Sequence, residues 1–339
     1  MEIAPLEAVK KMTLAHPNIW DTIDTLVKVP EDEIQWDRKI CYCPISAAIA
    51  ALSVDSDMLT AFGQASFAAA LAAWRRGKYI YQFDETLASE VILTVEDMVI
   101  PAEILYHMPS QCLFISLPTA ENKTPDYPSG FFAHIESDTN TGERELRIHY
   151  ITQSGILLTQ YIVHLIPDGT ISDGINAAIA EIRKNTYNNI YQPIGEHISD
   201  YLNKARTLTI QAVQLILYIC AENAEITENE AQAKIYRKSN KILDKYREIR
   251  KWDVGVKTGI ILRRNESKRN YTPDSQSANE NASGIKKRSH LRRAHWHHYW
   301  TGSGDDKKLI LRWINSTIIN PDEGDETPAT IIKLNPEKQ

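Results

Sequence analysis

Hydrophobic positions recur at two different periods along this chain, and the change of period predicts where its helices give way to strands. Residues 1–76 are predicted to be helical, because apolar side chains repeat at helical spacing and alanine dominates residues 56–76. From Tyr79 the period falls to two, and the clearest early strand is 112–117. Closely spaced strands separated by turn residues predict an antiparallel sheet over 79–167.

Helical patterns return after the sheet, and the C-terminal third changes character again. Residues 171–224 are predicted to form long helices, and the charged residues 231–263 a helical connector. Residues 264–285 contain few apolar groups and are predicted to be a flexible linker. Two strand-like runs around a turn predict a hairpin module at 286–319, followed by a mobile acidic tail at 320–339.

The predicted fold class is therefore α+β. It has a helical N-terminal part, an antiparallel sheet in the middle, long helices, and a small C-terminal aromatic and basic β-hairpin module. The helices and sheet up to residue 230 are expected to form one body, to which the connector, linker and hairpin are attached.

Charge separates this body from the C-terminal region. The chain has 339 residues and a formal net charge of −6. Residues 1–230 carry 15 Lys and Arg against 31 Asp and Glu, a net charge of −16, whereas residues 231–320 carry 21 against 8, a net charge of +13. Blocks of opposite sign predict two surfaces with different partners, although the basic region could instead dock on the acidic body.

Composition also disfavours several classes of protein. No apolar run reaches the ~18–20 residues of a membrane span, and no signal peptide is recognisable, so a cytoplasmic protein without a membrane partner is expected. Four cysteines do not make a disulfide framework and are expected to be reduced. Phosphate-loop, dinucleotide and hydrolase motifs are missing, so we expect no cofactor, no metal and no small-molecule substrate.

Residues 286–300 carry the most informative chemistry. They contain five Lys or Arg, four His and two Trp. Cations that pair with phosphates, next to aromatic faces on which bases stack, are typical of a surface that binds RNA or single strands. No catalytic residue is predicted. The predicted nucleic-acid or partner-binding residues are Arg288, His290, Arg292, Arg293, His295, Trp296, His297, Tyr299, Trp300, Arg312 and Trp313.

Other interpretations of the same residues stay open. Alternation along a strand would place two triplets of side chains on opposite faces: Trp296, His298 and Trp300, and His295, His297 and Tyr299. The aromatic residues could be only the small core of the hairpin. The histidines could bind a metal if further ligands came from elsewhere. His295 and His297 could act as the acid and base of a ribonuclease, or the protein could be a general nucleic-acid-binding regulator of a mobile element.

Residues 288–304 resemble a segment of the second type V-A anti-CRISPR family. That family carries Arg-Pro-His-Ile-Arg-Arg-Gly-His-Trp-His-Gly-Tyr-Trp-Gln-Gly-Thr-Gly, followed by an Arg-x-Arg-Trp strand whose place is filled here by residues 311–313. Ser289, Ala294 and His298 replace the Pro and two of the Gly residues. Weaker similarities occur upstream in the same order, at residues 73–75, 80–85, 109–117 and 217–222.

The resemblance implies an anti-CRISPR protein that blocks type V-A immunity by silencing the effector during its synthesis. Members of the family recognise the N-terminal segment of the type V-A effector nuclease as it is made, and the effector's messenger is then lost. The implied partners are the nascent peptide and its mRNA or the translating ribosome. The charge blocks suggest a division of labour, in which the acidic body would hold a basic nascent peptide and the basic hairpin module would touch RNA or the ribosome.

Overall fold

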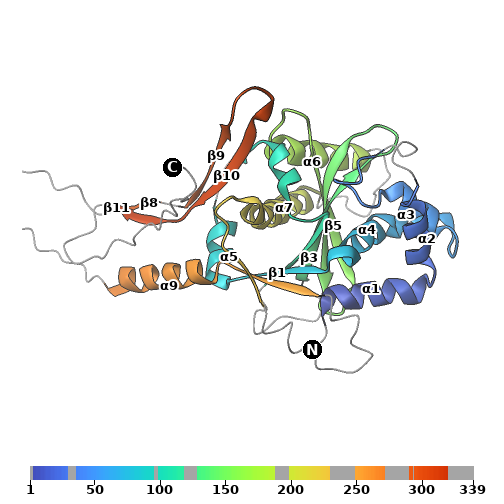
Figure 1. The fold of residues 1–339 in the computed structure, drawn as a ribbon, viewed down its shortest axis with the longest axis horizontal. Helices are drawn as coiled ribbons and strands as arrows, with labels where there is room; N and C mark the ends of the chain where they lie inside the picture. Colours follow the sequence, from blue (N-terminus) through green and yellow to red (C-terminus); the bar gives the residue numbers. More distant parts are fainter. Residues whose placement is uncertain are drawn as a thin grey trace, which may run out of the picture.

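A seven-stranded sheet forms the middle layer of the molecule, with helices on both of its faces (Figure 1). The computed structural model describes residues 3–29, 36–94, 98–117, 128–187, 198–229, 249–271, 290–292 and 294–319. The helical elements are α1 (Ala4–Ala15), α2 (Ile19–Leu26), α3 (Ile45–Leu52), α4 (Met58–Gly77), α5 (Glu85–Ile92), η2 (Ala102–His107), α6 (Ile171–Tyr187), α7 (Ile198–Cys220), α9 (Val256–Tyr271) and η5 (Gly304–Asp306). The strands are β1 (Tyr79–Phe83), β2 (Cys112–Ser116), β3 (Pro128–Ser137), β4 (Arg144–Thr152), β5 (Leu157–His164), β6 (Ile226–Glu228), β7 (Arg250–Val254), β8 (His290–Arg292), β9 (His295–Thr301), β10 (Lys308–Ile314) and β11 (Thr317–Ile319).

The sheet is mostly antiparallel, with strands in the order β5-β4-β3-β2-β1-β7-β6. The predicted fold class, α+β with a helical N-terminus, a mostly antiparallel central sheet and a C-terminal hairpin, is confirmed. One departure is β1, which runs parallel to both of its neighbours, β2 and β7. Parallel neighbours need a crossover connection, and α5 and η2 provide it between β1 and β2.

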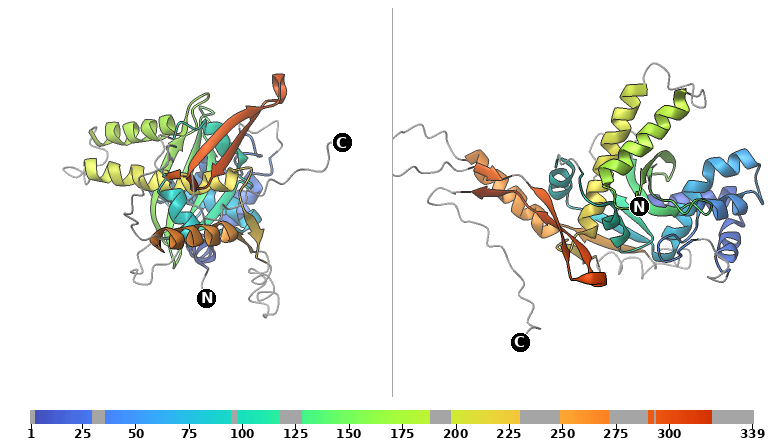
Figure 2. Two further views of the ribbon diagram at one scale, coloured as in Figure 1. Left: turned by 90° about the vertical axis from the view of Figure 1, so that its left-hand side faces the viewer. Right: turned by 90° about the horizontal axis from the view of Figure 1, so that it is seen from above.

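Neighbouring residues of each central strand pack into different apolar clusters, because successive side chains of a strand point to opposite faces of the sheet. In β2, Leu113 and Ile115 join the apolar cluster that contains α7. Cys112 and Phe114 join the cluster formed with the N-terminal helices. Trp74 of α4 is fully buried in that second cluster. The views in Figure 2 show helices on both sides of the strands.

Helix α4 is built to pack closely on the sheet. Its alanine-rich face is buried, and small side chains let a helix approach its neighbour. Asp57 caps its N-terminus by accepting a hydrogen bond from the backbone N–H of Thr60 at 3.0 Å. Arg75 and Arg76 lie in its last turn, where cations complement the helix dipole.

The predicted helical connector at 231–263 is wrong at residues 250–254, which form β7. The strand was missed because its charged sequence lacks a clear apolar alternation. Residues 256–263 belong to α9, which continues to Tyr271, so the predicted linker at 264–285 is wrong over its first eight residues.

Capping explains why so polar a segment forms α9. The carboxylate of Glu225 accepts hydrogen bonds from the backbone N–H groups of Lys257 and Thr258, both at 2.8 Å. Arg263 pairs with Asp84, the N-cap residue of α5, at 2.9 Å. The helix is therefore held at its first turn by a partner from the β6 segment and at its middle by α5, neither of which is visible in its own sequence.

Parts of the predicted connector, linker and hairpin module, and the whole of the predicted acidic tail, fall on residues 230–248, 272–289 and 320–339. These residues lie outside the described part of the chain. None of the helices that the structure describes combines the length and apolar character needed to cross a membrane. All four cysteines are free. The described segments bring no three His, Cys, Asp or Glu side chains together in a group that could hold a metal ion.

Replacing Gly255 with alanine should destabilise the junction between β7 and α9. Gly255 has φ +72°, and an added Cβ would overlap the side chain of Leu87 in the core. The left-handed backbone costs an alanine about 1–2 kcal/mol, and the overlap should add ~1–3 kcal/mol. Gly142 also has a positive φ, +74°, but nothing lies near its Cβ position. In denaturant unfolding, Gly142→Ala should show only the backbone cost. Equal losses in the two variants would contradict this account of Gly255.

Candidate nucleic-acid and partner interface

Strands β9 and β10 form the hairpin that the sequence predicts, and it extends beyond the sheet (Figure 1). Trp296 lies opposite Trp313, and Trp300 lies opposite Leu309. The pairing continues without a bulge, so the predicted alternation of side chains between the two faces of β9 is confirmed.

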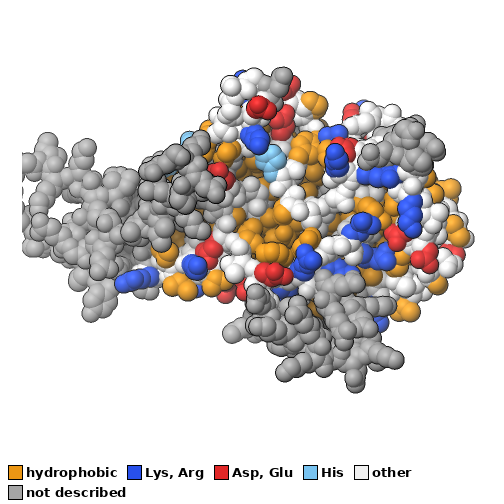
Figure 3. All heavy atoms as spheres, in the orientation of Figure 1, with side chains coloured by type: hydrophobic (Ala, Val, Ile, Leu, Met, Phe, Trp, Pro, Cys, Tyr) orange, Lys and Arg blue, Asp and Glu red, His pale blue; other side chains and the backbone are white. Residues whose placement is uncertain are grey.

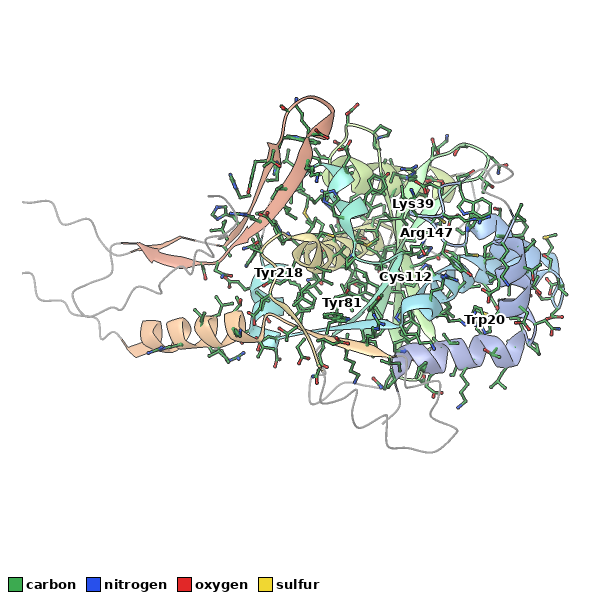
Figure 4. The ribbon with its side chains drawn as sticks, viewed as in Figure 1. Trp20, Lys39, Tyr81, Cys112, Arg147 and Tyr218 are labelled. Carbon is green, nitrogen blue, oxygen red and sulfur yellow. The ribbon has the colours of Figure 1, made fainter. Side chains whose placement is uncertain are left out.

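One face of the hairpin is built into the body. Trp296 and Trp313 are buried, and their rings contact each other edge-on at 4.6 Å. Trp313 also packs against Tyr218 of α7, which Figure 4 labels. All three belong to the apolar cluster that covers one face of the sheet. The core interpretation therefore holds for Trp296 and Trp313, but the core that they fill is shared with the body.

Polar groups in the turn that follows α7 hold β10 against the body. Asn223 accepts a hydrogen bond from the backbone N–H of Trp313 at 3.0 Å and donates one to its carbonyl oxygen at 2.8 Å. The backbone N–H of Glu222 donates to the carbonyl of Leu311 at 2.9 Å. The side chain of Asn223 thus takes the place of a neighbouring strand, because it satisfies both the backbone N–H and the carbonyl of Trp313.

A second polar connection is completely enclosed. Gln214 of α7 has no exposed surface. Its side-chain oxygen accepts a hydrogen bond from the indole N–H of Trp296, and its nitrogen donates to the carbonyl of Thr94 at 2.9 Å. A buried indole N–H needs an acceptor, so Gln214 makes the burial of Trp296 possible and also fixes the position of β9.

Other hairpin side chains remain at the surface. His297 and His298 are exposed, and Trp300 is 52% exposed. Lys307 and Lys308, at the turn end of β10, are exposed too. We call these five residues the hairpin surface. It places cations, imidazoles and one indole ring on a projecting two-stranded ribbon, a combination that can pair with phosphates and stack on bases.

Arg312 lies opposite His297, on the same face of the hairpin, but is already engaged. Its guanidinium pairs with Glu222 at 2.6 Å and lies over the ring of Tyr299 at 5.9 Å. The hydrogen bond with Glu222 raises the pKa of Arg312. The ring of Tyr299 is 5.4 Å from that of His297. Arg312 therefore positions this face of the hairpin.

The structure places the predicted site residues in different surroundings. Trp296 and Trp313 are buried anchors, and His297, Tyr299 and Trp300 lie on the projecting part. His295 is half-buried near the base of the hairpin. Outside the described residues are Arg288 and Arg293, and the side chains of His290 and Arg292, although the backbone of His290–Arg292 forms β8, paired with β11.

Sequence reasoning missed the partners of the hairpin. Gln214, Glu222 and Asn223 lie roughly ninety residues before it and carry no motif of their own. One signal pointed toward them, because residues 217–222 resemble the same anti-CRISPR family as the hairpin. The structure shows the physical link: β10 packs against α7, and its Leu311 carbonyl accepts a hydrogen bond from Glu222 just after that helix.

Comparison with known proteins identifies the class to which this arrangement belongs. The family model described as the Anti-CRISPR type V subtype A2 family (AcrVA2-like) matches residues 81–321, a span that begins within β1 and includes the rest of the sheet, α7 and the hairpin. The fold and hairpin are those of an anti-CRISPR protein. The chain belongs to the Anti-CRISPR type V subtype A2 family, which confirms the resemblance noted in its sequence.

A solved structure agrees with this assignment at the level of fold. The crystal structure of AcrVA2 superimposes with a TM-score of 0.60 and 17% sequence identity, and the match covers 94% of this chain and 100% of that chain. The sequence matches no curated protein. The N-terminal helices α1 to α4 precede the region that the family model matches.

Asn223→Ala should loosen the hairpin from the body. It would leave the backbone N–H and carbonyl of Trp313 without their side-chain partner, a loss of about 1–3 kcal/mol of unfolding free energy. Hydrogen exchange of the β9 and β10 amides should accelerate more than that of β3 and β4. Asn203→Ala, at an exposed position of α7, is the control and should change stability by less than ~0.5 kcal/mol. Uniform exchange across hairpin and sheet would contradict local anchoring.

Proposed function

We propose that this protein blocks type V-A CRISPR immunity by lowering expression of the effector nuclease. It recognises the N-terminal segment of the effector during translation, and loss of the effector mRNA follows. The observation that carries the proposal is the hairpin surface, where exposed cations and an exposed indole project from the body. Such a surface suits RNA or the translating ribosome as partner.

The proposal divides recognition between two parts of the molecule. The N-terminal helical layer and the hairpin lie at opposite sides of the sheet (Figures 1 and 2). The body carries most of the negative charge of the chain, which favours a basic peptide as its ligand. That charge is unevenly spread, since Figure 3 shows Lys and Arg side chains gathered over the N-terminal helical side of one face.

The protein acts in this proposal by binding, without a catalytic residue or cofactor. Its partners are the nascent effector peptide and the effector mRNA or the translating ribosome, met in the cytoplasm. Hairpin residues contact RNA or ribosome through Trp300, His297 and the neighbouring lysines, while Trp296 and Trp313 hold the hairpin in place.

Expression of this protein should reduce the transcript level of a type V-A effector in cells. Two effector constructs separate the possible readouts: one native, and one whose first codons are recoded synonymously. Loss of both transcripts is expected, because the encoded peptide is what the body recognises. Quantitative transcript measurement with and without the protein checks this outcome.

The other outcomes are equally informative. Loss of the native transcript alone would assign recognition to the RNA sequence rather than to the peptide. No loss of either transcript would overturn the silencing proposal. Cleavage of RNA by the purified protein, abolished in a His297→Ala variant, would show a ribonuclease instead of a binding protein.

Trp300→Ala should weaken RNA binding without destabilising the fold. Its side chain is 52% exposed, so truncation removes a stacking platform but little core. Stacking of one base on an aromatic ring contributes ~1–3 kcal/mol, which corresponds to about 5- to 150-fold in affinity. Binding of a single-stranded RNA should be measured by fluorescence anisotropy. Phe62→Ala, which removes a similarly exposed aromatic ring from α4, is the control and should bind RNA as the wild type does. Equal affinity of the Trp300 variant would rule out a stacking role.

A further inference from the structure

A small acidic cavity lies between the start of α3 and the turn that joins β3 to β4. Helix α3 lies on the side of the molecule away from the hairpin (Figure 1). Its volume is about 240 Å³. Its charged lining consists of four carboxylates and one cation: Glu136, Asp138, Glu143, Glu145 and Arg147. Sites for drug-sized ligands usually occupy ~300–1,000 Å³, so this cavity is matched to a single side chain or chain end.

Glu136 is the most deeply buried residue of this lining, with 4% of its surface exposed. Its Oε1 atom accepts a hydrogen bond from the backbone N–H of Ile45 at 2.7 Å, at the first turn of α3. Its Oε2 atom is also buried but has no hydrogen-bond partner within the described part of the chain. A buried carboxyl oxygen left unpaired is costly, so its retention calls for an explanation.

The neighbouring cations do not satisfy this oxygen. Arg147, labelled in Figure 4, is held by Glu145 at 2.7 Å and by Ser66 at 3.1 Å. The Nε2 atom of His134 lies 3.9 Å from Oε2 of Glu136, beyond hydrogen-bond distance. Burial lowers the pKa of His134 to about 3, so its ring is neutral at physiological pH. Glu136 therefore has no cationic partner of its own among these neighbours.

We propose that this cavity binds an ammonium group of a peptide, with Glu136 as its direct acceptor. One oxygen of Glu136 is already occupied by the backbone of α3, so the carboxyl cannot form the two-point contact that a guanidinium prefers. An ammonium is a compact charge that needs only one close oxygen. Asp138 and Glu143, exposed at the same lining, would attract the cation toward the cavity.

The ammonium could belong to a lysine side chain or to a free peptide amino terminus, and the chemistry is the same. Assigning it to a peptide rests on the proposed function, because the nascent effector segment is the ligand expected for the acidic body. The preference for an ammonium rests only on the cavity itself. A test of the cavity with simple peptides can therefore fail or succeed independently of the silencing assay.

Proton release should accompany binding. Burial raises the pKa of Glu136 to about 8, so the free carboxyl is mostly protonated at pH 7. An ammonium beside it favours the charged form and lowers that pKa, so the proton leaves on binding and affinity rises between pH 6 and pH 8. The titratable and charged groups that face Glu136 are His134, Asp138, Glu145, Arg147 and the buried thiols of Cys41 and Cys43.

The experiment is isothermal titration calorimetry of the full-length protein with three alanine-based pentapeptides. One is blocked at both ends and has a central lysine, one has glutamine there instead, and one has no lysine but a free amino terminus. Glu136→Gln is the test variant, because glutamine can still accept the hydrogen bond from Ile45 and so preserves the start of α3. Glu103→Gln removes the same charge from an exposed side chain outside the cavity.

Binding of the lysine peptide or of the free-amine peptide is expected, and the one that binds names the source of the ammonium. Glu136→Gln should weaken it at least tenfold and abolish proton release, whereas Glu103→Gln should change neither. Equal binding of the glutamine peptide, no binding of any peptide, or unchanged binding by Glu136→Gln would overturn the proposal. If the peptides bind as expected but the wild type leaves effector transcripts intact, the silencing function fails and the ammonium site stands.

Discussion

Burial of the central strands on both faces is the constraint on which the remaining structure depends. In β1, β2 and β3, successive side chains enter two different apolar clusters, so neither face can be left to solvent. Helices α1 to α4 cover one face, while α5, α6 and α7 cover the other. The hairpin completes the second cover, because Trp296 and Trp313 fill the cluster that contains Tyr218. A surface element is thereby tied to the core.

This connection bears on how the hairpin can serve as a binding element. A two-stranded ribbon is marginal in isolation. Here its base is fixed by Gln214 and Asn223, while Trp300 and His297 stay exposed further out. The exposed groups are therefore presented on a support that is already ordered, which reduces the conformational entropy lost on binding. The acidic cavity is anchored in the same way, since its most buried carboxyl is fixed by the first turn of α3.

Periodicity along the chain predicted the helical N-terminus, a sheet over 79–167 that contains five of the seven strands, and the hairpin, because these elements are amphipathic enough to show in local sequence. It failed at β7, whose residues are charged and whose strand character comes from pairing with β1. The alternation of β9 was predictable. The local sequence could not show that Trp296 is buried and Trp300 is exposed, because this difference depends on how far the body extends beneath the hairpin. Gln214, Asn223 and Glu136 were beyond such reasoning, since their partners lie about ninety residues away in sequence.

The parallel pairing of β1 with β7 has a consequence for the synthesis of this protein itself. Tyr81 lies opposite Trp252, so one side of β1 has no partner until nearly three quarters of the chain has been made. Until then the growing sheet ends in an open strand edge, the kind of edge that recruits other chains. Contacts between residues so distant in sequence also form slowly. Strands β6 and β7, the last two strands of this sheet to leave the ribosome, therefore complete it and protect it from aggregation.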